Sequence, residues 1–288
     1  MPKQKIIVCI PARYGSTRFP AKVLAKDTGK FLIQHVYEQA KLAKLPDRVI
    51  IAADDKRIEE AAKSFGAECI MTNPNCPSGT DRIAEAIKKL SAIRYPLSAN
   101  DIVVNLQGDE PEIDPANIDT VAKLLVDNPK CQMATLAAEF ENRKQIADPN
   151  IVKVVVAYSV ERIADSWKLK TQNSKLKTNC GIAIYFSRSV IPYDRQQGGT
   201  GEIKNYLRHI GIYAYRGNFL LKVTKLPQTP LEKLEKLEQL RAVENGFDIL
   251  VAKVKHTCAG IDTPEQYAEF VKRYSHREHR GHREYEKG

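Results

Sequence analysis

The first half of the chain alternates between short apolar runs and segments of helical periodicity. The apolar runs are continuous and rich in β-branched residues, and they cover residues 5–10, 48–52, 68–71 and 102–106. The segments that follow them repeat apolar residues at helical spacing, over residues 31–44, 55–65, 81–90 and 115–126. Continuous apolar strands that alternate with helices are typical of a parallel sheet covered on both faces. The pattern therefore predicts an α/β fold with a mostly parallel sheet.

The second half is expected to be richer in strands, over residues 133–140, 152–158, 182–186, 209–215 and 249–254. Two late helices have strong start signals, because Thr229-Pro230 and Thr263-Pro264 each place a threonine N-cap before proline. The polar segment 168–178 is expected to be a loop or a hairpin tip, and the glycine-rich segment 196–202 is expected to be a mobile loop. After Ser275, HREHRGH spaces histidines by three residues, which favours a solvated, frayed terminus over a metal-binding tail.

The composition is that of a globular protein, with 43% hydrophobic and 28% charged residues among 288. No apolar run approaches the roughly 20 residues that span a bilayer, and none near the start forms a signal-peptide core. We therefore expect a cytoplasmic protein without membrane insertion. The net charge of +10 suits nucleic acid, a membrane surface or small phosphorylated substrates, but the dispersed cations and 7% aromatic content disfavour nucleic acid. The six cysteines show no C-x-x-C pair, so a zinc site or disulfide framework is not expected.

Cations and hydroxyls gather directly after the first apolar run, in the stretch IPARYGSTRFPAK from Ile10 to Lys22. Ligands of open α/β sheets bind beyond the carboxyl ends of the strands, so this stretch and Gln107-Gly108-Asp109-Glu110 are expected on one rim. Phosphate cradles combine backbone amides, small residues and a lysine after a strand. The Walker pattern and G-x-G-x-x-G are absent, which disfavours kinases, ATPases and dinucleotide-dependent dehydrogenases. The alternative is a charged surface loop.

PARYGSTRFPAK resembles the N-terminal signature of sugar nucleotidyltransferases, in particular the cytidylyltransferases that activate 3-deoxy-D-manno-octulosonic acid (Kdo). The resemblance continues, in the family's order and up to about residue 273, through SGTDRIAEA, VVNLQGDEP, IYFSRSVIP, HIGIYAYR, LEKLEQLRAVE and GIDTPEQYAEF. It implies one Rossmann-like, doubly wound domain of the nucleotidyltransferase type over residues 1–274, with a smaller β-rich dimerisation and sugar-binding region at about 133–216. Residues 275–288 would be a charged tail. The implied reaction is Mg²⁺-dependent synthesis of CMP-Kdo and pyrophosphate from CTP and Kdo, by a homodimer, for lipopolysaccharide biosynthesis.

The resemblance also implies roles for individual residues. The expected catalytic residues are Arg13, Lys22 and Asp109, and the expected nucleotide contacts are Ala12, Arg13, Ser16, Lys22, Ser78, Arg82 and Gln107. Asp109 and Asp262 are the expected Mg²⁺ ligands, since hard cations take carboxylate oxygens. The expected sugar contacts are Gln107, Arg188, His209, Tyr213, Glu238 and Gln239.

Several of these residues also have ordinary structural interpretations. From the residues alone, Asp262 equally suits a helix start, His209 better suits a satisfied core histidine, and Gln107 could tie two loops together. Glu238 is expected on the leucine-lined face of one helix that begins at Thr229, so its carboxylate needs a partner. That partner is either Arg241 on the same helix or the hydroxyls of a sugar.

Two positions depart from the family pattern. Ala21 stands where the family usually has glycine, which should limit any left-handed backbone conformation there. Cys76 stands where many relatives have histidine, so a histidine contact to substrate would be absent or supplied by another residue. The rival interpretations are the same reaction on 8-amino Kdo or another acidic sugar, a catalytically silent nucleotide-binding protein and, more weakly, a nucleic-acid-binding module.

Overall fold

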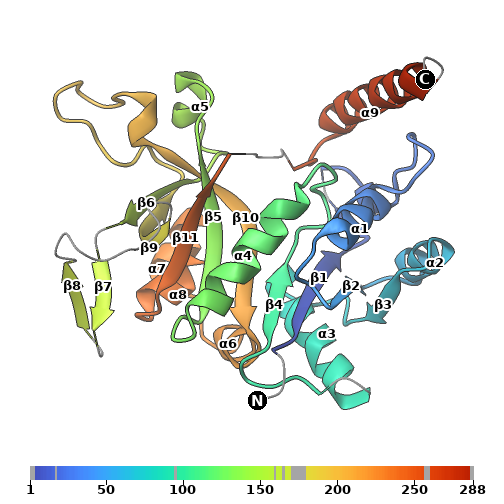
Figure 1. Ribbon diagram of the computed structural model, residues 1–288, viewed down its shortest axis with the longest axis horizontal. Helices are drawn as coiled ribbons and strands as arrows, with labels where there is room; N and C mark the ends of the chain where they lie inside the picture. The colour runs from blue at the N-terminus through green and yellow to red at the C-terminus, as the bar shows by residue number, and fades with distance from the viewer. Residues whose placement is uncertain are drawn as a thin grey trace. The chain divides into compact units, whose positions relative to one another are not determined.

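The computed structural model describes residues 4–16, 18–93, 96–158, 160–163, 166–169, 180–255 and 260–285 (Figure 1). The chain divides into two compact units. Unit 1 comprises Met1–Ile6, Leu97–Asn105 and Ala116–Thr257, and unit 2 comprises Ile7–Pro96, Leu106–Pro115 and Cys258–Gly288. No helix among the described residues is long and apolar enough to cross a membrane.

Unit 2 contains the parallel strands that the sequence predicted. β1 (Ile6–Ala12), β2 (Arg48–Ala53) and β3 (Glu68–Met71) pair in the order β3-β2-β1, and both pairings are parallel. Four consecutive β1 residues, from Ile7 to Ile10, are fully buried, which explains why the strand is apolar on both faces. The helices of this unit are α1 (Leu32–Leu42), α2 (Lys56–Ser64) and α3 (Gly79–Ile93).

The last helix of unit 2 is α9 (Pro264–Tyr285), and its start follows the sequence signal. The Gln266 amide donates to Thr263 Oγ1 at 3.3 Å, and Gln266 Oε1 accepts the Thr263 amide at 3.1 Å. Tyr267 and Phe270 then pack on Leu32 of α1. The helix continues through the charged segment after residue 275, where a frayed terminus was expected. Side chains beyond residue 276, with two of the three spaced histidines, lie outside the described set.

Unit 1 corrects the expectation of a mostly parallel sheet. Its strands are β4 (Ile102–Asn105), β5 (Met133–Glu139), β6 (Lys153–Ala157), β9 (Cys180–Ser187), β10 (Leu207–Arg216) and β11 (Ile249–Val254). They follow the order β4-β10-β5-β11-β9-β6, with β5–β11 parallel and the other described pairings antiparallel. A parallel pair needs a long crossover, usually helical, and the helices of the second half are mostly too short to provide one. The fold is therefore mixed α/β.

The remaining elements of unit 1 lie between these strands along the chain. They are α4 (Pro115–Asp127), α5 (Arg143–Ala147), α6 (Gly217–Val223), α7 (Pro230–Glu235) and α8 (Leu240–Glu244), a hairpin of β7 (Val160–Ile163) and β8 (Ser166–Leu169), and a 3₁₀ turn at Ile203–Asn205. Pro115 itself belongs to unit 2. The segment expected as a loop over 168–178 therefore begins inside β8, and most of it lies outside the described residues.

The expected single helix after Thr229 is wrong. α7 ends at Glu235 because Lys236 adopts a left-handed conformation with φ 55°, and α8 begins only at Leu240. Glu238 therefore lies in the turn between two short helices and on neither of them. Leu234, one of the leucines of the apolar face expected for that helix, is 79% exposed. Leucines at helical spacing form one apolar face only while the helix continues, and the residue pattern does not indicate the break at Lys236.

Candidate active site

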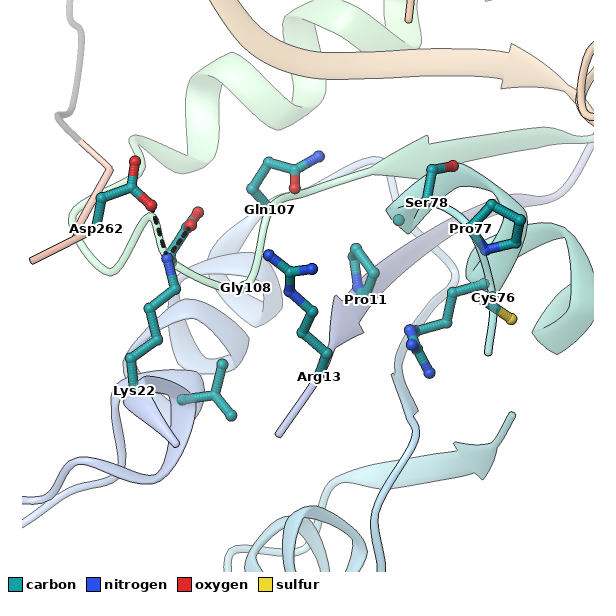
Figure 2. A pocket seen from close by; sticks show the side chains of 13 residues that line it. Pro11, Arg13, Lys22, Cys76, Pro77, Ser78, Gln107, Gly108 and Asp262 are labelled. Atoms are coloured by element: carbon teal, nitrogen blue, oxygen red, sulfur yellow. Dashed lines mark hydrogen bonds and ion pairs between the residues drawn. The ribbon is translucent and has the colours of Figure 1, made fainter. Parts of the chain in front are cut away.

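A pocket of about 270 Å³ opens in unit 2 beyond the carboxyl end of β1 (Figure 2). It is lined by residues from the opening stretch and the position after it, the segment before α3 and the first turn of α3, the turn after β4 and the segment before α9: Pro11, Arg13, Lys22, Val23, Cys76, Pro77, Ser78, Gly79, Arg82, Gln107, Gly108, Asp109 and Asp262. The opening stretch and the Gln107-Gly108-Asp109 turn thus share one rim, as the strand pattern predicts.

The Gln107-Gly108-Asp109 turn lies tightly against β1. The Leu106 amide donates to the Cys9 carbonyl at 3.2 Å. A Cβ atom on Gly108 would lie 2.8 Å from the Pro11 carbonyl oxygen and 3.1 Å from Ile33 Cδ1. Only glycine fits this approach, so Gly108 allows the two flanking side chains to reach the pocket.

One side of the pocket holds a lysine between two carboxylates (Figure 2). Lys22 Nζ lies 2.6 Å from Asp109 Oδ2 and 3.0 Å from Asp262 Oδ1, and it also donates to the Ile261 carbonyl at 2.8 Å. Arg18 Nη2 lies 3.0 Å from the other oxygen of Asp262. Burial alone would raise the pKa of Asp262, but the hydrogen bonds and charges of Lys22 and Arg18 outweigh it and lower that pKa.

Lys22 is presented by a strained turn. The preceding residue, Ala21, has φ 52° and ψ 25°, the left-handed conformation that the change from glycine was expected to limit. Its amide donates to the Tyr14 carbonyl at 3.2 Å, and the Lys22 amide donates to the Phe19 carbonyl at 3.2 Å. These bonds hold the alanine in a conformation that costs about 1–2 kcal/mol for an L-residue with a Cβ.

The opposite side of the pocket is built around Arg82, at the start of α3. Arg82 is 4% exposed, and its guanidinium donates to Thr72 Oγ1 at 2.8 Å and to Asp54 Oδ2 at 3.1 Å. The second oxygen of Asp54 accepts the Tyr14 amide at 2.9 Å. Asp54 was missed at the sequence level, although it directly follows β2 at the carboxyl edge of the parallel strands. Arg82 therefore reaches the pocket with much of its hydrogen-bonding capacity already used.

The remaining predicted nucleotide residues divide into lining and supporting positions. Arg13 and Gln107 line the pocket, and the Arg13 guanidinium points into it (Figure 2). Ser78 also lines it and caps α3, since Ser78 Oγ accepts the Asp81 amide at 3.1 Å. Ala12 is buried at the end of β1, and Ser16 lies in the following loop; neither is among the lining residues.

Cys76 lines the pocket without carrying a reactive thiolate. Its sulfur lies 3.3 Å from Glu85 Oε2, and burial, with the hydrogen bond to Glu85, raises the pKa of the thiol to about 11. The thiol is therefore protonated near neutral pH, and it donates to a carboxylate outside the Lys22 side of the pocket.

The predicted sugar residues, apart from Gln107, belong to unit 1. His209 and Tyr213 lie on β10 with ring centroids 5.3 Å apart. Thr135 Oγ1 lies 3.0 Å from His209 Nε2 and also contacts the Ile212 and Ile210 carbonyls, at 2.8 and 3.1 Å. The Thr135 hydroxyl has one proton, and it donates this proton to the two carbonyls. His209 Nε2 therefore carries a proton and donates it to Thr135 Oγ1. Burial lowers the pKa of His209 to about 3, which keeps the ring neutral.

Arg188 is anchored by the end of α7. Its Nε donates to the Glu235 carbonyl at 2.8 Å, its Nη1 donates to the Pro149 carbonyl at 3.0 Å, and the Glu235 carboxylate accepts its backbone amide at 3.0 Å. Arg241, one of the two alternative partners expected for Glu238, forms an ion pair with Glu232 through bonds of 2.9 and 2.5 Å. Glu232 is the buried carboxylate of this region, at 4% exposure.

Gln239 has an unusual environment beside Glu238. It is 6% exposed, and its amide nitrogen Nε2 has no hydrogen-bond partner among the described residues. A buried amide donor without a partner is costly, so the position suits a ligand that accepts the bond.

Comparisons with known proteins agree over nearly the whole chain. Residues 7–249 match the family model described as cytidylyltransferase. The 3-deoxy-manno-octulosonate cytidylyltransferase of Solibacter usitatus is 45% identical, over 92% of this chain and 92% of its own length. The 8-amino-3,8-dideoxy-manno-octulosonate cytidylyltransferase of Shewanella frigidimarina is 43% identical, over 91% and 95%. The structure of CMP:2-keto-3-deoxy-manno-octonic acid synthetase complexed with CTP is 36% identical, with a TM-score of 0.79 over 95% of this chain and 100% of that one.

Proposed function

Because the chain belongs to the cytidylyltransferase family, we propose that it joins CTP and Kdo to give CMP-Kdo and pyrophosphate. The chain is a nucleotidyltransferase, and its resemblance to the Kdo-activating enzymes is confirmed by relatives 38–46% identical over about 90% of its length. The structural observation that carries the proposal is the pocket beyond β1, where two cations, Arg13 and Lys22, line the same cavity as two carboxylates. A triphosphate and its divalent cation require that combination. The product would supply activated Kdo for lipopolysaccharide biosynthesis.

In the proposed reaction, the anomeric hydroxyl oxygen of Kdo bonds to the α-phosphorus of CTP. The bond from that phosphorus to the bridging oxygen of the β-phosphate breaks, the hydroxyl proton is released, and pyrophosphate leaves. Arg13 and Lys22 would neutralise charge on the phosphates, and this stabilisation grows as pyrophosphate departs. Ala12, Ser16, Ser78 and Gln107 would complete the nucleotide site, while Arg82 would order its wall through Asp54.

Asp109 and Asp262 fit a Mg²⁺ ion. Both present carboxylate oxygens to the same 3 Å region around Lys22 Nζ, and the Ile261 carbonyl oxygen joins them. Mg²⁺ prefers oxygen ligands and usually takes only one or two protein carboxylates. Two aspartates are therefore enough for a Mg²⁺ site, although the described residues contain no group of three or more possible metal ligands. A bound Mg²⁺ would supply electrophilic stabilisation of phosphate charge.

We assign sugar recognition to Gln107 and to the unit 1 residues Arg188, His209, Tyr213, Glu238 and Gln239. The support comes from their chemistry. The neutral His209 ring and the unpartnered Gln239 amide suit hydroxyl groups, and a guanidinium such as that of Arg188 suits a carboxylate. A cytoplasmic location and a homodimer are further proposals. The first agrees with the use of CTP, and the second rests on the family resemblance.

The second candidate is the same reaction on 8-amino Kdo, since a relative with that name is 43% identical. The test is pyrophosphate release with CTP and, in turn, Kdo, 8-amino Kdo and a sialic acid. We expect kcat/KM to be at least about tenfold higher with Kdo than with either analogue. A preference for 8-amino Kdo would replace the Kdo assignment, and no release with any sugar acid would favour a silent nucleotide-binding protein.

A further inference from the structure

Lys22 has every ammonium proton engaged in this structure. Nζ donates to Asp109, to Asp262 and to the Ile261 carbonyl, at 2.6, 3.0 and 2.8 Å. An ammonium group has three donors and no acceptor, so these contacts complete its hydrogen bonding. The Lys22 side chain is only 13% exposed. In this arrangement Lys22 has no proton left for a phosphate oxygen.

Two cations contact the carboxylates of Asp109 and Asp262, and these cations differ in their exposure to solvent. Lys22 contacts both and is largely removed from water, whereas Arg18 contacts Asp262 alone with its side chain 65% exposed. Exposed ion pairs are screened by solvent and contribute little, so Lys22 is the main counter-charge. A divalent cation added to this site would meet the positive charge of Lys22 at close range, unless a polyanion such as CTP is bound as well.

We propose that Lys22 is the counter-cation of the Asp109–Asp262 pair in the unliganded protein, that a divalent cation displaces it from these carboxylates, and that it transfers to phosphate when nucleotide binds together with the cation. The inference rests on the proposed function, since it takes Asp109 and Asp262 as the cation ligands. Lys22 would therefore contact the two carboxylates in the unliganded protein and the phosphates of the nucleotide in the liganded one.

The backbone beside Lys22 is suited to such a movement. Ala21, directly before it, is one of two non-glycine residues with positive φ in the described part of the chain. The turn is held by only a few hydrogen bonds, among them those from Ala21 to Tyr14 and from Lys22 to Phe19. Strain stored next to a functional side chain is released when the backbone rotates there.

The proposal predicts that cation and nucleotide bind with positive cooperativity. Either ligand alone must compete with the intact contacts of Lys22, and the first to bind removes part of that cost for the second. By linkage, the nucleotide raises cation affinity by the same factor as the cation raises nucleotide affinity. Removing the Lys22 charge should strengthen binding of the cation alone and weaken the cooperativity.

The experiment measures Mn²⁺ binding by the electron paramagnetic resonance signal of free Mn²⁺, without CTP or sugar. Lys22→Met keeps the aliphatic chain and removes the charge, and we expect it to bind Mn²⁺ roughly ten- to a hundredfold more tightly than the parent chain. Lys30→Met is the matched control, because Lys30 pairs with Glu38 at 2.7 Å, away from the two aspartates. It should leave Mn²⁺ affinity within about twofold. Adding Asp109→Asn to Lys22→Met should abolish the gain.

Unchanged or weaker Mn²⁺ binding by Lys22→Met would overturn the proposal. If that variant does not fold, Lys22→Gln replaces it, and the parent chain gives an independent readout. Acylation of Lys22, measured by peptide mass spectrometry, should rise at least about threefold when Mn²⁺ is added alone at saturation, because the amine leaves its carboxylates. Constant acylation would also overturn it. These measurements contain no substrate, so an active enzyme without the Lys22 effect refutes this inference only, whereas an inactive chain refutes the proposed function.

Discussion

Asp54 and Arg82 form a buried ion pair in the pocket wall, with Asp54 Oδ2 3.1 Å from Arg82 Nη2 and side-chain exposures of 10% and 5%. The other oxygen of Asp54 accepts the Tyr14 amide at 2.9 Å, so one carboxylate connects α3 to the loop that carries the proposed phosphate-binding residues. Arg82 therefore holds this loop in place, in addition to the nucleotide contact proposed for it. A role of this kind predicts that loss of Asp54 affects both stability and CTP binding.

Asp54→Asn preserves the shape of the side chain and leaves the Arg82 charge without its carboxylate. Breaking a buried pair in this way costs about 3–5 kcal/mol, and the freed loop should raise KM for CTP several-fold with a smaller change in kcat. Urea unfolding and steady-state kinetics measure the two effects. The control is Glu68→Gln, which breaks the half-exposed Arg48–Glu68 pair and should cost less than about 1 kcal/mol. Equal losses in the two variants would remove the special role of Asp54.

Asp109→Asn and Asp262→Asn are each expected to lower turnover by orders of magnitude while leaving the fold intact. Loss of a cation ligand removes several kcal/mol of stabilisation of developing phosphate charge. Pyrophosphate release at low millimolar Mg²⁺, together with a melting curve, measures both properties. Glu112→Gln is the control, because Glu112 follows the same turn but pairs with Arg273 at 2.7 Å. Near-normal turnover in either aspartate variant excludes that residue from the site.

Ala21→Gly is expected to stabilise the protein by about 1 kcal/mol. Ala21 has φ 52°, and glycine adopts this region without the clash of a Cβ atom. The entropy that glycine gains in the unfolded chain offsets part of the benefit. Ala25→Gly is the matched control, since Ala25 has φ −59° and the same change should destabilise by about 0.5–1 kcal/mol. Chemical unfolding of both variants checks the sign, and a destabilised Ala21→Gly contradicts the assignment of strain.

The parts of the structure that sequence reasoning predicted well are those with a local cause. β1 and β2 are continuous apolar runs because both of their faces are covered, and α9 begins at a capping box that the sequence shows directly. The rim shared by Arg13, Lys22 and Asp109 followed from the parallel strands alone. Individual roles for these residues came from the family resemblance.

The errors have non-local causes. A continuous apolar run indicates that a strand is buried but does not fix the direction of its partners, so the antiparallel pairing of β10 with β4 and β5 was not predicted. The helix breaks at Lys236, which has a left-handed conformation although it is not glycine, so the sequence did not indicate the break. Glu238 was expected to be the buried carboxylate of this region, but the structure buries Glu232. Asp54 was missed because its partners, Tyr14 and Arg82, are distant in sequence.

His209 predicts a pH dependence of stability. Burial lowers its pKa to about 3 from an ordinary value of about 6.5, so the unfolded chain binds a proton between these pH values that the folded chain does not. The contribution of His209 to stability is therefore complete above about pH 6.5 and is lost as the pH falls toward 3. The slope for one proton is at most about 1.4 kcal/mol per pH unit, and we expect about half of it because the residue keeps some exposure to solvent.

His209→Gln removes the titration and retains an amide that can donate to Thr135 Oγ1. Unfolding free energies measured with urea between pH 6.5 and 4 should fall less steeply for this variant than for the parent chain. Parallel curves would show that His209 is protonated in the folded protein over this range.

Gln239→Leu separates sugar recognition from structural support. Gln239 is 6% exposed, and its Nε2 donor has no partner among the described residues, so the unliganded protein carries the cost of a buried, unsatisfied amide. Leucine is similar in size and lacks that donor, so the variant should be about 1 kcal/mol more stable. If Nε2 binds a hydroxyl of the sugar, the same variant should lose about three- to tenfold in kcat/KM for Kdo, with CTP binding unchanged. Melting curves and kinetics with each substrate varied in turn measure the two effects.

A Gln34→Leu control removes a satisfied bond from Gln34 to Glu38 on the surface of α1 and should leave the Kdo kinetics alone. A variant at Gln239 that is less stable, with unchanged Kdo kinetics, would make this glutamine a structural residue.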